Sequence, residues 1–345
     1  HIPALSAEVQ DAWQVLDTAF GDGSNFLACW QHWRDEHSRP TLLHYVGLLP
    51  AVPDKGWPHE LAPLCAGVGP GFHRLLLQDG QVSLTLCIGP LQAMLSELAM
   101  QADTVFLGAS TDPWDKWAIK ALARLCRRGT QLVTRPGSNL PRDALEDAGF
   151  RTAADSAPAI AGPMPPSHFY EPRWNLAHNR KGNTSTPVKE PARCAVVGAG
   201  LAGASVAHAL AVRGWQVTVL DQHPGPAGGA SGLPVGLVVP HVSADDSPRS
   251  RMSRSGTRLM LHHARRLLTE GEDWAPSGVL EHRDAHEGDL WHPMAGWIKP
   301  ARLVQAWMNH PGIRFMGDTA VVGLRWQDGT WCVQGDAGQA LARAE

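Results

Sequence analysis

Membrane-spanning segments, paired cysteines and metal-binding histidine patterns are all missing from this 345-residue chain. It has no apolar run long enough to cross a bilayer, so we expect no membrane partner. Its six cysteines are scattered without a C-x-x-C pair, which favours free thiols in a reducing cytoplasm over disulfides or a zinc site. The 17 histidines lack H-E-x-x-H spacing, so no metal site is predicted. We also expect no signal peptide, although a chain that starts at His1 is processed or lacks its beginning.

The most informative motif is a G-x-G-x-x-G sequence formed by Gly198, Gly200 and Gly203. An apolar run precedes it and a small-residue helical pattern follows it, which predicts a strand, a tight turn and a helix. The first glycine permits the turn, the second lets the backbone approach a pyrophosphate, and the third lets the helix pack close to the strand. Residues 216–220 predict the next strand, and Asp221 follows it, where an acid accepts hydrogen bonds from an adenosine ribose. A dinucleotide site is therefore favoured over a structural glycine-rich turn.

A second small-residue loop indicates which dinucleotide binds. Residues 223–232 contain Ala230, Ser231 and Gly232 soon after the ribose acid. A loop at this spacing suits a cofactor with a bulky second half, such as FAD, because its amides and the Ser231 hydroxyl could reach phosphate or flavin. The alternative is a flexible surface loop.

Strand-like and helix-like stretches alternate along the first 165 residues, which predicts a mostly parallel α/β sheet with helices on both faces. The clearest helical patterns cover residues 114–127 and 141–149. Asp17, Gly21 and Gly23 form a D-x-A-x-G-x-G turn similar to the first motif of class I S-adenosylmethionine (SAM) methyltransferases. We therefore expect two Rossmann-like domains, a methyltransferase-like sheet at 1–165 and an FAD-binding domain with an inserted substrate sheet at 192–345, joined by a linker at 166–191.

Several blocks together resemble the bifunctional tRNA wobble-uridine enzymes of the MnmC family. They are residues 19–30 (AFGDGSNFLACW), 169–174 (FYEPRW), 198–203, 230–232 and 295–300 (AGWIKP), and they occur in family order over nearly the whole chain. The resemblance implies that the second domain uses FAD to remove the carboxymethyl group from 5-carboxymethylaminomethyl-uridine at position 34 of tRNA. It also implies that the first domain methylates the resulting amine with SAM, giving 5-methylaminomethyl-2-thiouridine.

The chain departs from the family at three acids of the methyl-transfer site. The corresponding places hold Leu48, Pro90 and Gly108, whose side chains can neither orient a ribose nor accept a proton from an amine. Each lost hydrogen-bonding carboxylate costs on the order of 1.5–3 kcal/mol. We therefore expect SAM binding and methyl transfer to be weakened or lost. If the acids of the family correspond to other positions of this chain, the candidate substitutes are Asp103, Asp112 and Asp115.

A basic segment offers a tRNA contact, with Arg249, Arg251 and Arg254 as the candidate residues. A solvated helix face is the alternative for any single arginine. Residues 321–326 and 330–333 predict strands of the substrate sheet, and no glycine-rich segment that would close the flavin site follows them, so we expect either a fragment or an incomplete site.

The sequence names no catalytic acid or base and no oligomeric state. Two alternatives to a tRNA-modifying enzyme stay open. One is a small-molecule amine or amino-acid oxidase with a relic methyltransferase domain, and the other is a non-catalytic binding protein.

Overall fold

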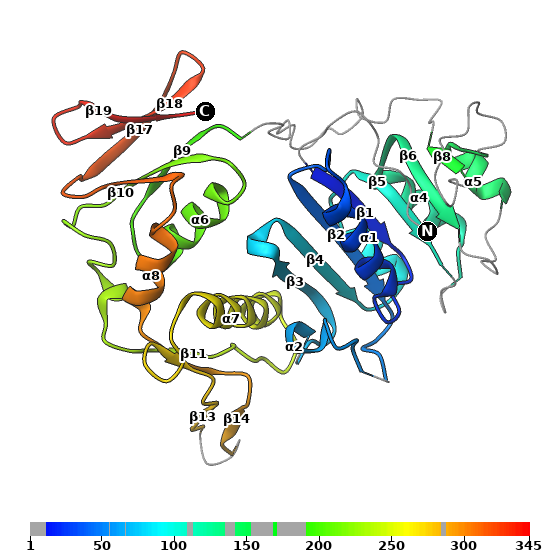
Figure 1. The fold of residues 1–345 in the computed structure, drawn as a ribbon, viewed down its shortest axis with the longest axis horizontal. Helices are drawn as coiled ribbons and strands as arrows, with labels where there is room; N and C mark the ends of the chain where they lie inside the picture. The colour runs from blue at the N-terminus through cyan, green and yellow to red at the C-terminus, as the bar shows by residue number, and fades with distance from the viewer. Residues whose placement is uncertain are drawn as a thin grey trace. The chain divides into compact units, whose positions relative to one another are not determined.

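The computed structural model describes residues 12–54, 56–65, 67–108, 113–134, 142–152, 168–170, 191–283 and 288–345. The chain forms two units, residues 1–187 and residues 188–345 (Figure 1). None of the helices in these described ranges is both long and apolar enough to span a membrane.

Unit 1 is built on an eight-stranded sheet with the order β3-β4-β2-β1-β5-β6-β8-β7. The pairs from β4 through β6 are parallel, whereas β3 is antiparallel to β4, and β8 is antiparallel to β6 and β7. The strands are β1 Ala12–Asp17, β2 Leu42–Leu49, β3 Gly71–Leu77, β4 Val82–Ile88, β5 Ala102–Leu107, β6 Cys126–Thr134, β7 Phe150–Thr152 and β8 His168–Tyr170. This arrangement confirms the mostly parallel α/β sheet predicted from the alternation of elements.

Both faces of this sheet are covered. Val15 and Leu16 are neighbours in β1 and fully buried, but they belong to different hydrophobic clusters because successive side chains of a strand point to opposite faces. One cluster includes α1 residues such as Phe26, and the other includes α3 and α4 residues such as Leu95. The helices of unit 1 are α1 Ser24–Asp35, α2 Ala62–Cys65, the 3₁₀ turn η1 Gln78–Gly80, α3 Leu91–Glu97, α4 Lys116–Arg124 and α5 Arg142–Ala148.

Three details of unit 1 differ from the expectations. Helix α4 ends at Arg124, so the last residues of the helix expected over 114–127 turn and enter β6. Strand β8 falls inside the range expected to be a linker, because Tyr170 is buried against Phe150 with ring centroids 4.9 Å apart. Of that range, residues 166–167 and 171–190 lie outside the described residues. The edge strand β3 was not predicted.

Unit 2 begins with a parallel three-stranded sheet of order β16-β10-β9. Strand β10 covers the residues predicted for it. The strands are β9 Arg193–Val197, β10 Gln216–Leu220, β11 Gly236–Val238, β12 Trp274–Ala275, β13 Val279–Glu281, β14 Leu290–His292, β15 Gly296–Ile298, β16 Ile313–Met316, β17 Val321–Gln327, β18 Thr330–Gly335 and β19 Ala340–Ala344. Strands β17 and β18 were predicted, but with β19 they form a separate antiparallel sheet that is not hydrogen-bonded to the β11-β15-β12 sheet.

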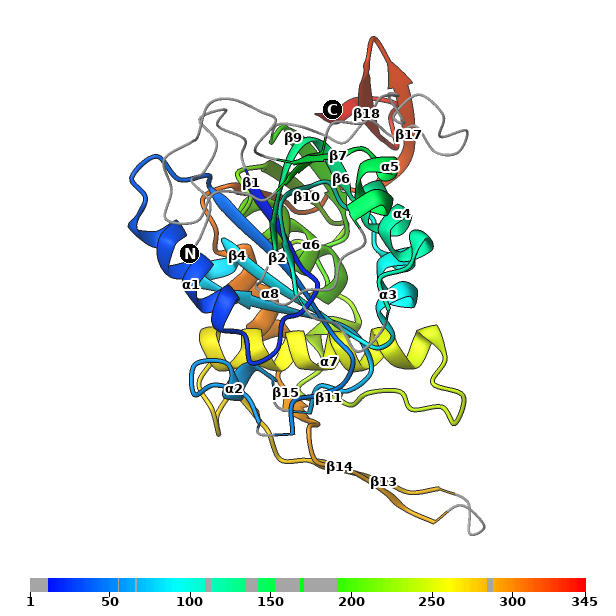
Figure 2. The same ribbon diagram turned by 90° about the vertical axis from the view of Figure 1, so that its right-hand side faces the viewer.

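The helices of unit 2 are α6 Leu201–Ala211, the 3₁₀ turn η4 Ala230–Gly232, α7 Pro248–Leu267 and α8 Pro300–Met308. Helices α6 and α8 pack against each other, and α6 also contacts β9, β10 and β16 (Figure 1). Figures 1 and 2 show the β13–β14 hairpin projecting from the rest of the unit. The strand–turn–helix predicted around the G-x-G-x-x-G motif is therefore β9, the turn 198–200 and α6.

Candidate functional site

The glycine-rich turn between β9 and α6 requires glycine at two of its three motif positions. Gly198 has a φ of +99°, and its N–H donates to the carbonyl of Leu220 over 2.7 Å, which ties the turn to the end of β10. A β-carbon added at Gly203 would lie 2.9 Å from the carbonyl carbon of Gly198 and closer still to its oxygen. Only glycine therefore lets α6 start this close to β9.

The second predicted loop meets the first at the N-terminus of α6. The N–H of Leu201 donates to the Ser231 hydroxyl over 3.0 Å, and a β-carbon at Gly200 would lie 3.0 Å from that same oxygen. Ala230, Ser231 and Gly232 form the turn η4, and a β-carbon at Gly232 would lie 2.6 Å from the carbonyl oxygen of Ala227. Two loops about 30 residues apart in sequence thus converge on one helix end.

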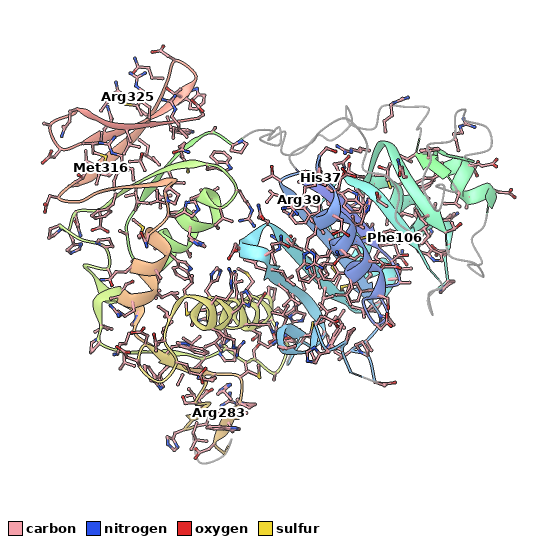
Figure 3. The ribbon with its side chains drawn as sticks, viewed as in Figure 1. His37, Arg39, Phe106, Arg283, Met316 and Arg325 are labelled. Atoms are coloured by element: carbon pink, nitrogen blue, oxygen red, sulfur yellow. The ribbon has the colours of Figure 1, made fainter. Side chains whose placement is uncertain are left out.

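Asp221 lies directly after β10 and is held by its own chain. Its Oδ2 accepts the Ala199 N–H over 2.6 Å, and its Oδ1 accepts the backbone N–H and the ring Nδ1–H of His223 over 2.9 and 2.8 Å. Its backbone N–H donates to the carbonyl of Met316 at the end of β16, which is labelled in Figure 3. Burial alone would raise the pKa of the carboxyl, but the hydrogen bonds from Ala199 and His223 outweigh it and hold that pKa below its ordinary value.

These features fit the adenosine diphosphate half of FAD. The first amides of a helix have no carbonyl partner within the helix and carry partial positive charge, so the start of α6 suits a diphosphate. Gly200 carries no side chain that would crowd the Ser231 hydroxyl at this helix end. An ionised carboxylate 12% exposed at the end of the adjacent strand suits ribose hydroxyls. The structure brings together all seven residues predicted for FAD: Gly198, Gly200, Gly203, Asp221, Ala230, Ser231 and Gly232.

The glycine-rich turn of unit 1 has the expected backbone shape, but the carboxylate of its aspartate, Asp17, already accepts several hydrogen bonds. Gly21 and Gly23 have φ values of +59° and +87°. The carboxylate of Asp17, which is 1% exposed, accepts the Ala19 N–H over 3.0 Å, the Tyr45 hydroxyl over 2.7 Å and the Asn25 amide over 3.0 Å. These contacts stabilise the turn and leave Asp17 little capacity for a ligand.

Three described positions at the carboxyl edge of the unit 1 sheet, where the family resemblance expects acids, hold other residues. Strand β2 ends in Leu48–Leu49, Pro90 precedes α3, and Gly108 follows β5. Asp103 lies near the opposite, amino end of β5, where it pairs with Arg127. Asp115 caps α4 by accepting the N–H groups of Trp117 and Ala118 over 2.9 and 2.8 Å. Asp112 is outside the described residues. Leu48, Pro90 and Gly108 therefore supply no carboxylate for the ribose, the adenine or the amine.

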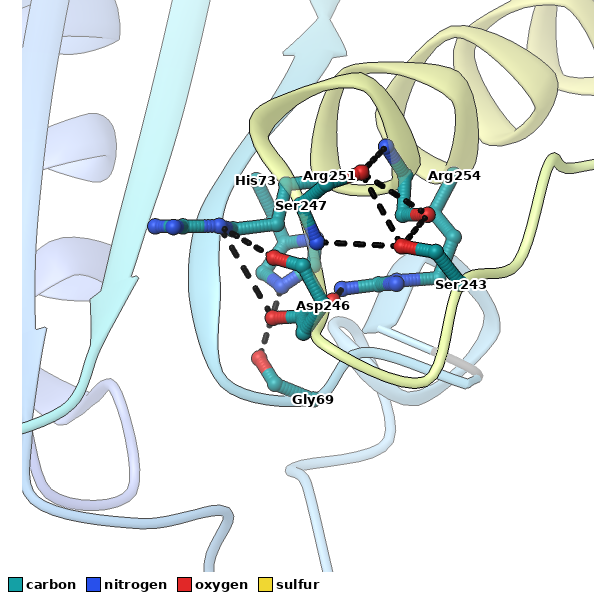
Figure 4. Close-up of polar contacts among 8 residues, drawn as sticks. Gly69, His73, Ser243, Asp246, Ser247, Arg251 and Arg254 are labelled. Atoms are coloured by element: carbon teal, nitrogen blue, oxygen red, sulfur yellow. Dashed lines mark hydrogen bonds and ion pairs between the residues drawn. The ribbon is translucent and has the colours of Figure 1, made fainter.

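The predicted tRNA-contact arginines lie in the first turns of α7, and Figure 4 shows two of them, Arg251 and Arg254, near Asp246. Ser247 caps the helix by accepting the Ser250 N–H, and the hydroxyl of Ser243 bonds both of these serines. The carboxylate of Asp246 pairs with Arg254 at 2.6 Å and with Arg251 at 3.7 Å, so it offsets part of their charge. Arg249 is exposed. The three arginines therefore lie at the same helix end, but the positive charge of Arg251 and Arg254 is partly offset by Asp246.

His223 belongs to the site and was not predicted. Its position two residues after the ribose acid was visible in the sequence. Its contact with Asp221, however, depends on the turn that brings its ring back onto that carboxylate.

Comparison with protein families agrees with the two units. A family model described as FAD dependent oxidoreductase matches residues 193–289, and one described as S-adenosyl-L-methionine-dependent methyltransferase matches residues 57–159. The chain thus joins a methyltransferase-like domain to an FAD-dependent oxidoreductase domain.

Among named proteins, the tRNA 5-methylaminomethyl-2-thiouridine biosynthesis bifunctional protein MnmC of Albidiferax ferrireducens is 46% identical over 371 residues, covering 97% of this chain and 60% of that protein. The protein of the same name from Polaromonas naphthalenivorans is 42% identical, covering 97% of this chain and 61% of that protein. The chain is therefore a homologue of the MnmC bifunctional proteins along nearly all of its own length, and it spans about 60% of theirs. A solved glycine oxidase from Geobacillus kaustophilus matches 42% of this chain and 52% of its own, at 16% identity and a TM-score of 0.37, which is too low to add to this assignment.

Proposed function

We propose that the protein modifies the wobble uridine of tRNA through FAD-dependent oxidation in unit 2, and that methyl transfer in unit 1 is lost. The observation that carries the oxidative half is the convergence of Gly203, Ser231 and Asp221 around the N-terminus of α6. The names of the relatives support tRNA as the substrate. Because tRNA is modified where it is used and the described cysteines are free thiols, the proposed location is the cytoplasm.

The residues of unit 2 bind and orient rather than react. The amides at the start of α6 and the Ser231 hydroxyl would hold the diphosphate, and Asp221 would hold the ribose. When bound, FAD supplies the two-electron acceptor for oxidation of the substrate's secondary amine. The CH–NH group of the carboxymethylaminomethyl substituent loses a hydride and a proton. Water then cleaves the resulting imine into glyoxylate and an aminomethyl group that stays on the uridine. Positioning the neutral amine is the main task of the protein.

Unit 1 does not support the second half of the proposed reaction sequence, which is methyl transfer. It has the methyltransferase-like sheet, yet Leu48, Pro90 and Gly108 stand where the family resemblance expects acids, and Asp17 already accepts hydrogen bonds from Ala19 and Tyr45. The proposed product is therefore the primary amine, and a separate methyltransferase would have to supply the methyl group.

Contact with tRNA phosphates is proposed for Arg249, Arg251 and Arg254 at the start of α7. Arg249 carries the strongest case because it is exposed, whereas Asp246 offsets the charge of the other two.

Mass spectrometry of tRNA tests the proposal. Undermodified tRNA carrying the carboxymethylaminomethyl group is incubated with the purified protein, FAD and oxygen, and the wobble nucleosides are analysed with and without SAM. We expect the aminomethyl nucleoside in both cases. Oxidation of free glycine derivatives but not of tRNA would favour a small-molecule amine oxidase. No oxidation of either substrate by the FAD-loaded protein would favour a binding protein.

A further inference from the structure

We infer that His223 is a positioning residue of the adenosine end of the FAD site, fixing which oxygen of Asp221 faces the ribose. This inference rests on the proposed function, because it concerns how the cofactor is held. No step of the oxidation itself requires His223.

The imidazole of His223 forms a hydrogen bond with the carboxylate of Asp221, the residue proposed to bind the ribose. His223 Nδ1 lies 2.8 Å from Asp221 Oδ1, and the backbone N–H of His223 donates to the same oxygen over 2.9 Å. An ionised carboxylate only accepts hydrogen bonds, so Nδ1 must carry the proton. One residue therefore supplies two donors to one carboxylate oxygen.

The side chain of His223 also packs on a second segment of the chain. A β-carbon at Gly228 would lie 2.9 Å from His223 Nδ1 and closer still to Cβ and Cγ, so the side chain packs directly on the Gly228 backbone. Gly228 begins the stretch that leads to η4 and Ser231. The carbonyl of His223 accepts the Asp318 N–H over 3.1 Å from the turn after β16. Backbone and ring are thus fixed by two different segments.

The contacts of His223 determine which lone pairs of the Asp221 carboxylate stay available to a ligand. A carboxylate has about four lone-pair positions, two on each oxygen. The two donors of His223 fill Oδ1, and the Ala199 N–H takes one position on Oδ2 at 2.6 Å. The remaining position on Oδ2 is left for a ribose hydroxyl. Without the imidazole, Oδ1 keeps only the backbone N–H of His223, so the orientation of the carboxylate that suits the sugar is held by one donor fewer.

Binding of FAD and of ADP to the purified protein tests the role of His223. ADP carries the adenosine diphosphate half without the flavin. We expect His223→Ala to weaken both ligands by a similar factor of about ten, the value for one hydrogen bond to a charged group. His223→Asn keeps a side-chain donor at the same backbone position and should recover most of the affinity. His282→Ala is the matched control, because His282 also pairs with an aspartate, Asp289, over 3.0 Å, but is 77% exposed on the β13–β14 hairpin.

Three outcomes overturn the inference. If His223→Ala binds FAD and ADP as tightly as the unchanged protein, His223 does not position Asp221. If His223→Asn is as weak as His223→Ala, the ring acts through packing and not through its donor. If only FAD weakens while ADP does not, the effect lies at the flavin end. A folded, unchanged protein that binds neither ligand contradicts the proposed function itself, which separates the two failures.

Discussion

Replacing Gly203 with alanine is the sharpest perturbation of the FAD site. In an ordinary helix this change is favourable by about 1 kcal/mol, since alanine is the better helix former. Here the new methyl group would lie 2.9 Å from the carbonyl carbon of Gly198, closer to its oxygen, and 3.3 Å from Cγ1 of Val196. Non-bonded carbon atoms prefer about 3.5–4.0 Å. A backbone carbonyl cannot rotate out of the way as a side chain can, so the turn 198–200 must move.

The size of the effect follows from this overlap. Inserting a methyl group into a packed site costs about 1–3 kcal/mol. If that strain falls on the FAD-binding arrangement of the turn, affinity drops by about fivefold to a hundredfold. Gly256 in α7 is the matched control, because a β-carbon there meets nothing within 4 Å. Gly256→Ala should leave FAD affinity unchanged and stabilise the protein by about 0.4–1 kcal/mol.

The assay is titration of each purified variant with FAD, followed by flavin fluorescence, with urea denaturation of the FAD-free protein alongside. Gly203→Ala should weaken FAD binding and lower the free energy of unfolding, whereas Gly256→Ala should do neither. If Gly203→Ala binds FAD with unchanged affinity, the close approach of α6 to β9 has no part in cofactor binding.

Four further predictions concern the carboxylate, a histidine, unit 1 and the tRNA contact. Asp221→Asn should weaken FAD binding about tenfold or more at pH 7, measured by the same titration, while Asp336→Asn at an exposed turn should not. Burial lowers the pKa of His263 from 6.5 to about 4. Between these two pH values the unfolded chain binds a proton at His263 and the folded chain does not. The free energy of unfolding should therefore fall by about 2 kcal/mol, after allowance for solvent screening, as the pH drops from 6.5 to 4. His263→Gln should flatten this slope in urea denaturation at several pH values. Calorimetric titration with SAM should show no binding in the micromolar range, and micromolar binding would refute the loss of its site. Arg249→Glu should weaken tRNA binding and reduce its dependence on salt in a filter-binding assay, without changing FAD affinity.

The regular elements could be predicted where the local pattern and the final structure agree. Strand β10 and the turn before α6 follow from an apolar run, three glycines and a small-residue helix, all within one stretch of chain. The end of α4 was misplaced because Cys126 continues the apolar stripe of the helix, although it is buried as the first residue of β6. Strand β8 is only three residues long, and its partner Phe150 is distant in sequence, so no local periodicity reveals it.

For the candidate site, the sequence predicted the residues whose type has a direct chemical reason. Gly203 and Asp221 are in this class, because close approach needs glycine and a ribose needs an acceptor. The expected loss of the methyl-transfer acids stays a prediction, because it depends on the family resemblance at Leu48, Pro90 and Gly108. His223 was missed because its role depends on a turn geometry and on the space above Gly228. The partial neutralisation of Arg251 and Arg254 by Asp246 likewise depends on how the loop enters α7.

The central claim is that unit 2 holds one FAD at the start of α6, and equilibrium binding measures it most directly. The folded protein, stripped of flavin, is titrated with FAD and then with FAD in the presence of excess ADP. We predict one FAD bound per chain with micromolar or tighter affinity, and competition by ADP. A well-folded protein that takes up no FAD, or binds it without competition from ADP, would contradict the claim.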